Sequence, residues 1–165
     1  MTPSSHGPVP PAGRVPPMTA LAFSTIGFVA VLIAGFGMTS LLTDTEVVAV
    51  PKLGFLPGAG AVAAATVIFA AITARAVRVS RPQYTAVIAI TASVFIGYVA
   101  GLWLGALLSG AGLAPATAAV GSFATSVFAL VLLGAAAVCG WSAIALVRTR
   151  AGRPRWPWED DDPES

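Results

Sequence analysis

The sequence contains few charged residues, nine basic and seven acidic among 165. Charged residues make up 10% of the chain, whereas soluble globular domains carry ~25%. Hydrophobic residues make up 56%, and the mean hydropathy is +0.85. A small soluble domain cannot bury so much apolar sequence without leaving large adhesive patches. The composition therefore excludes an ordinary soluble enzyme and predicts an integral membrane protein surrounded by the lipid bilayer.

Histidine and cysteine are almost missing, because His6 and Cys139 are the single examples of each. A metal site needs three or four convergent ligands, and a nucleophile needs a base beside it. Neither pattern occurs, and there is no glycine-rich phosphate-binding motif with a lysine. We therefore expect no enzymatic activity, no cofactor and no metal, and we interpret Cys139 as a packing residue. Nucleic-acid binding is not expected either, because the basic residues cluster beside the apolar segments.

Three long stretches contain no charged residue, namely 15–43, 53–74 and 82–147. A membrane-spanning helix needs ~20 mostly apolar residues. The longest stretch is divided at Ser109–Pro115, where two glycines and a proline indicate a turn. We therefore predict an all-α polytopic membrane protein, an antiparallel bundle of four transmembrane helices within residues 18–148. The predicted spans are 19–42, 58–76, 84–109 and 116–147, and the last must tilt or extend past the headgroups.

The segments outside these spans differ in composition. Residues 1–17 contain six prolines and are predicted to form a disordered cytoplasmic arm. Residues 149–165 change from basic through aromatic to acidic and are predicted to form a cytoplasmic tail. The outer loop, 43–57, is unusually apolar, so we expect it either to lie on the membrane surface or to cap the bundle.

The positions of the basic residues predict the threading, since cytoplasmic loops are enriched in lysine and arginine. Placing both termini in the cytoplasm puts eight basic residues inside and only Lys52 outside. The prediction is a multi-pass protein of the plasma membrane whose topogenic residues are Arg75, Arg78, Arg81, Arg148, Arg150, Arg153 and Arg155. These arginines could also attract anionic lipid headgroups, at ~1 kcal/mol per charge. The tail has two interpretations. Either its arginines hold the C-terminus in the cytoplasm, or it is a docking segment for a partner.

Small residues recur every four positions in the third span, at Ser93, Gly97, Gly101 and Gly105. Small residues let helix backbones approach closely in lipid. The stripe therefore has two interpretations. It is a self-association face of a homo-oligomer, or it packs against a neighbouring helix of the same chain.

Apart from Arg75 at the end of the second, no Asp, Glu, Lys, Arg or His lies within a predicted span. Such residues usually mark proton relays and ion pathways. The small multidrug exporters depend on a glutamate in their first helix, so the likeness to them stops at the number of helices. Our first hypothesis is a structural or accessory subunit, of unknown specific function, that acts through helix–helix contacts with itself or a larger complex. The alternative is a small transporter or channel for an uncharged or lipid-like solute, with a helix break at Gly35, Gly37 and Thr39–Ser40.

The C-terminal segment Arg153-Pro-Arg-Trp-Pro-Trp-Glu159 and the four-helix layout carry one resemblance. The chain resembles small uncharacterised four-helix integral membrane proteins of high-GC actinobacteria. This resemblance implies a membrane location but no known activity, and no functional residue is carried over from it.

Overall fold

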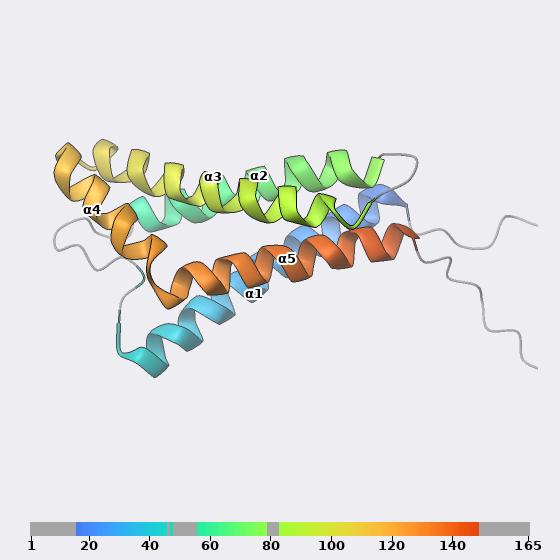
Figure 1. Cartoon of the computed structure of the whole chain (residues 1–165), viewed down its shortest axis with the longest axis horizontal. Coiled ribbons are helices and arrows are strands. Elements are labelled where there is room, and N and C mark those ends of the chain that lie inside the picture. Colours follow the sequence, from blue (N-terminus) through green and yellow to red (C-terminus); the bar gives the residue numbers. More distant parts are fainter. Residues whose placement is uncertain (1–15, 46, 48–55, 79–82, 149–165) are drawn as a thin grey trace, which may run out of the picture.

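The computed structural model describes residues 16–45, 47, 56–78 and 83–148. These ranges contain five helices and no strand (Figure 1): α1 Pro17–Thr43, α2 Leu56–Arg78, α3 Ala86–Leu108, α4 Leu113–Ala124 and α5 Val127–Arg148. Helices α1, α2, α3 and α5 are long and apolar enough to cross a membrane. At ~1.5 Å per residue even α5 extends for roughly 33 Å, which exceeds a ~30 Å hydrocarbon core. The prediction of an all-α chain with four membrane-length helices is confirmed.

Helix α1 is continuous from end to end. It begins at Pro17, where a proline fits the first helical position, and it ends where Asp44 adopts a left-handed conformation with φ 51°. The break expected at Gly35, Gly37 and Thr39–Ser40 does not occur, so that prediction is wrong. The physical reason is packing: a Cβ atom at Gly35 would lie 2.5 Å from Val131 Cγ1, so α5 lies directly against the helix there.

A tight turn separates α3 from α4. Gly110 has φ +83°, a conformation that a glycine adopts without a steric penalty. Its backbone N–H donates to the Leu107 carbonyl, and the next N–H, of Ala111, donates to the Ala106 carbonyl. This pair of bonds is the Schellman motif that ends many helices. Pro115 then lies in the first turn of α4, where its missing N–H is not needed.

Residues 116–147, predicted as one long helix, form parts of two helices, so that prediction is wrong. Helix α4 ends at Ala124 and α5 begins at Val127. The hydroxyl of Thr125 donates to the Gly121 carbonyl at 3.0 Å, and that of Ser126 donates to the Phe123 carbonyl at 2.7 Å. Because serine and threonine hydroxyls compete for helix carbonyl groups, a cluster of them bends or ends a helix.

The helices form two pairs, with α2 beside α3 and α1 beside α5 (Figure 1). Helix α4 runs from the end of α3 to the start of α5 across one end of the molecule. The core lies between the pairs, because α1 buries every fourth residue from Ala20 to Phe36 and α2 does so from Pro57 to Val77. Helix α5 contacts all four other helices.

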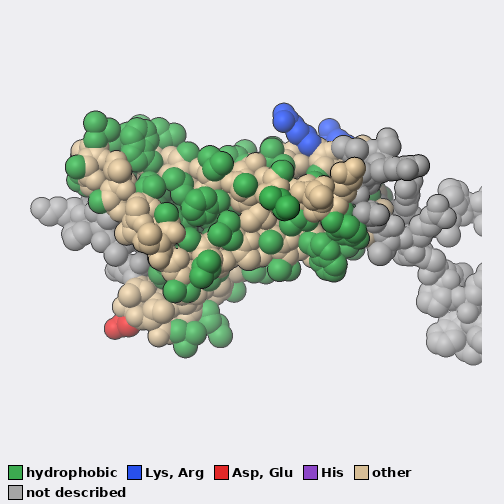
Figure 2. Space-filling model, viewed as in Figure 1, with side chains coloured by type: hydrophobic (Ala, Val, Ile, Leu, Met, Phe, Trp, Pro, Cys, Tyr) green, Lys and Arg blue, Asp and Glu red, His purple; other side chains and the backbone are tan. Residues whose placement is uncertain are grey.

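The outward surface is apolar over much of its area, as the hydrophobic side chains in Figure 2 show. Large exposed side chains include Phe23, Ile33, Ile96, Leu130 and Trp141. In the outer loop, Val47 is half-buried and packs against the main core. Residues 48–55 lie outside the described ranges, as do 1–15 of the proline-rich arm and 149–165 of the tail.

Candidate functional site

The glycines of the small-residue stripe lie against α2. A Cβ atom at Gly97 would lie 2.3 Å from Ile68 Cδ1, and one at Gly101 would lie 2.8 Å from Ala64 Cβ and 3.0 Å from Ala61 Cα. At Gly105 it would lie 2.9 Å from Pro57 Cα. Two of these contacts involve backbone atoms, which cannot move aside as a side chain can. Glycine at these positions is therefore what allows α2 and α3 to pack so closely.

The position of the stripe bears on its two interpretations. Ser93 is half-buried, whereas Gly97 is buried. All three glycines contact α2 of the same chain, as the second interpretation expects.

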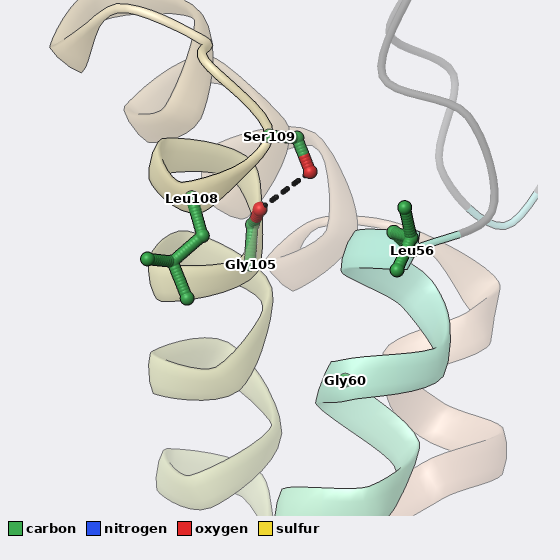
Figure 3. Close-up of a pocket in the computed structure, with 5 residues that line it drawn as sticks. All are labelled: Leu56, Gly60, Gly105, Leu108 and Ser109. Atoms are coloured by element: carbon green, nitrogen blue, oxygen red, sulfur yellow. Dashed lines mark hydrogen bonds between the residues drawn. The ribbon is translucent and has the colours of Figure 1, made fainter.

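An open groove lies between α2 and α3 at the end of the molecule near α4. Its volume is about 470 Å³, and its lining residues are Leu56, Gly60, Gly105, Leu108 and Ser109 (Figure 3). The Ser109 hydroxyl donates to the Gly105 carbonyl at 2.8 Å, so the one polar side chain in the lining bonds to its own helix. The groove therefore offers apolar contact and no reactive group.

Sequence reasoning missed an aromatic cluster that joins four helices. Tyr98 of α3 stacks on Phe123 of α4, with ring centroids 4.3 Å apart. Phe36 of α1 meets both rings edge-on and also meets Phe128 of α5, at 5.7 Å. Edge-to-face and offset-stacked rings are the favoured geometries. A signal was present in α1, where Phe28, Leu32 and Phe36 recur every four residues, but their partners on other helices could not be read from it.

The topogenic arginines are only partly within the described residues. Arg75 and Arg78 are exposed in the last turn of α2 (Figure 2), and the Arg78 guanidinium donates to the Met18 sulfur at 3.9 Å. Arg148 is the last residue of α5, but its side chain lies outside the description. Arg81, Arg150, Arg153 and Arg155 also lie outside it.

Within the described ranges, no three His, Cys, Asp or Glu side chains gather as a metal site would require. Cys139 is buried in the main core, where it packs among apolar side chains. The described residues therefore present helix contacts, an apolar groove and a basic end as the features open to functional interpretation.

These features define the class: an all-α chain whose four long apolar helices suit a polytopic membrane protein. The chain belongs to the family of unknown function DUF6121, which matches residues 17–165. The match begins at the first residue of α1 and includes the C-terminal tail. No curated protein and no solved structure matches the chain significantly. The expected resemblance to uncharacterised proteins is thus confirmed at the level of the family. The resemblance to actinobacterial proteins in particular, and the part that the tail motif has in it, stay predictions.

Proposed function

We propose that the chain is a plasma-membrane protein with four antiparallel spans and both termini in the cytoplasm. The α2–α3 contacts support opposite chain directions, because Pro57, Ala64 and Ile68 meet Gly105, Gly101 and Gly97 in reverse order. The start of α1 and the ends of α2 and α5 lie at one end of the molecule (Figure 1), and Arg75 and Arg78 are exposed there. This basic end is the cytoplasmic one by the positive-inside rule, and its arginines would attract anionic headgroups.

Within that membrane the protein acts as a structural or accessory subunit through helix–helix contacts, without catalysis, cofactor or nucleic acid. The observation that carries this proposal is an outward-facing notch on α5. Gly134 is exposed, and apart from its own stretch of helix backbone no described heavy atom lies within 4 Å of a Cβ built there. Leu130 and Val138, one turn before and after it, are exposed large apolar residues. A small residue between large ones lets a partner helix approach closely in lipid.

The partner helix comes from a second copy or from a larger membrane complex, and mass measurement distinguishes these two. The protein is extracted from its native membrane in a mild detergent, and the mass of the particle is measured. We expect a homo-oligomer or a complex with co-purifying proteins. A strict monomer that co-purifies with nothing would contradict the proposal.

A matched pair of variants tests the notch itself. Gly134→Leu fills the notch, and its Cβ has no neighbour within 4 Å outside its own stretch of helix, so we expect a folded protein that has lost its partner. Thr117→Leu on α4 is the control, because Thr117 is exposed far from Gly134 along the chain. If Gly134→Leu retained the mass of the wild-type particle, the notch would not be the contact.

A second candidate function is a small transporter or channel for an uncharged or lipid-like solute. The observation that favours it is the break between α4 and α5, because interrupted membrane helices expose carbonyl groups to a substrate path. The test is solute flux into liposomes that contain the purified protein. Absence of flux across a broad panel of neutral solutes would leave the accessory role as the better proposal.

A further inference from the structure

Contacts between the helices fix which residues lie at the same depth in the bundle. Phe28 stacks on Phe69 with centroids 4.5 Å apart, which aligns α1 with α2. Gly97 meets Ile68, which aligns α3 with α2. Helix α5 is aligned by two contacts, Val131 with Gly35 of α1 and Gly140 with Ile90 of α3. Because each pair runs in opposite directions, residues before a contact on one helix lie level with residues after it on the other.

This alignment places one hydroxyl-bearing segment of every spanning helix at a common depth. Counting from the contacts, Ser24 lies level with Thr73 and with Ser142, and Thr73 lies close to the level of Thr91. Each is between one and two turns from the basic end of its helix, roughly 8–10 Å at ~1.5 Å per residue. We name Ser24, Thr25, Thr73, Thr91 and Ser142 the hydroxyl layer. These hydroxyls form a layer across the helices and not a stripe along one helix.

The hydroxyl layer contains the two polar residues that are buried within the described ranges. Thr73 is 0% exposed and Ser24 is 5% exposed. The hydroxyl oxygens of Thr25, Thr73 and Thr91 are buried and have no hydrogen-bond partner among the described residues. Within the layer, Ser24 and Ser142 donate to carbonyls of their own helices at 3.0 and 2.7 Å. Outside it, Thr66 and Ser109 do the same, and the Tyr98 hydroxyl in the aromatic cluster is a single buried group without a partner among the described residues. Buried hydroxyls without a partner are unfavourable, so three in one layer call for a ligand.

Aromatic rings separate the layer from the opposite end of the bundle. The Phe28–Phe69 stack lies one turn beyond Ser24 and Thr73, and Phe36, which meets Tyr98 and Phe123, lies two turns further along α1. On the other side the layer is followed by the basic end, where Arg75 and Arg78 are exposed. The short route from an aqueous phase to the layer therefore runs through the basic end.

We propose that the hydroxyl layer binds a small uncharged hydrogen-bonding molecule, with water as the first occupant, entering from the basic end. The chemistry supports a neutral ligand, because hydroxyls both donate and accept hydrogen bonds. The charged residue next to the layer, Arg75, is exposed on the outside of α2. This site does not depend on the accessory role, and it can be hydrated whether or not the protein binds a partner.

Thiol accessibility tests the proposal in protein reconstituted in liposomes. In a Cys139→Ala background, Thr73→Cys and Ala65→Cys place a thiol on the same buried face of α2, on either side of Phe69. The probe is hydroxyethyl methanethiosulfonate, which reacts with a thiolate and so requires water at the sulfur. We expect Thr73→Cys to react at least tenfold faster than Ala65→Cys. Equal rates for the two variants would overturn the proposal.

An isosteric variant gives a second readout in case the cysteine variants do not fold. Thr73→Val removes the hydroxyl and keeps the shape of the side chain. In a hydrated layer this change removes a partner of the bound molecule, so we expect a thermal midpoint no higher than that of the wild type. A higher midpoint would show that the hydroxyl is dry and unpaired, and would overturn the proposal. Urea or glycerol added to the thiol assay then distinguishes a bound solute from bound water as the occupant of the layer. A solute that binds there slows the reaction of Thr73→Cys.

Discussion

Individual glycines have different roles in this bundle, and the atoms opposite each glycine decide which. Gly101 faces the backbone of α2, whereas Gly134 faces outward and meets no described atom of the chain. Both occupy helix interiors, where glycine is ~0.5–1 kcal/mol less favourable than alanine. The first glycine is required for packing within the chain, and the second is available to a partner.

Substitution by alanine separates these two roles. Gly101→Ala places a methyl group 2.8 Å from Ala64 Cβ, so α2 and α3 must move apart, and we expect a loss of about 1–3 kcal/mol in the free energy of unfolding. Gly134→Ala adds a methyl group in open space, so we expect a gain of roughly 0.5–1 kcal/mol. Thermal unfolding in detergent measures both. Equal effects from the two substitutions would contradict the assigned packing.

At the scale of the element, the sequence predicts the helices better than it predicts their ends and contacts. Three long charge-free stretches, the last divided at the turn of Gly110 and Pro115, indicate the four long helices. The break after Ala124 is not evident, because Ser122, Thr125 and Ser126 resemble other hydroxyl residues of the spans until their back-bonding is seen. The glycine stripe indicates close packing but does not name the partner helix, since that depends on contacts distant in the sequence.

Phe123 is the largest of the buried side chains of α4. Phe123 stacks on Tyr98 and meets Phe36, and each aromatic pair contributes about 0.5–1.5 kcal/mol beyond area burial. We expect Phe123→Ala to loosen α4 from α3 while leaving α2 in place, so amide hydrogen exchange should accelerate over Leu113–Ala124 and not over Leu56–Arg78. Leu113→Ala is the control, because Leu113 lies on the same helix and is exposed. Unchanged exchange in Phe123→Ala would show that other contacts hold α4.

For the whole molecule, the property to test is the proposed orientation of the helices across the membrane. We expect a green fluorescent protein fused after Ser165 to fluoresce and alkaline phosphatase fused there to be inactive, because the proposed orientation places the basic end in the cytoplasm. Alkaline phosphatase inserted in the turn at Gly110–Gly112 should be active, because that turn lies at the opposite end of α3. The reverse pattern of activities would contradict the proposed orientation, although it would leave the helix contacts unaffected.

The position of α5 also constrains how the protein is made. It is the last helix in the chain order, yet it touches each of the four helices synthesised before it. Until the ribosome has released this segment into the bilayer, Phe36 of α1 lacks its Phe128 contact and Gly35 lacks Val131. In the proposed membrane protein, helices that insert in chain order therefore pass through a stage in which the earlier ones are in the bilayer but lack the contacts that α5 supplies.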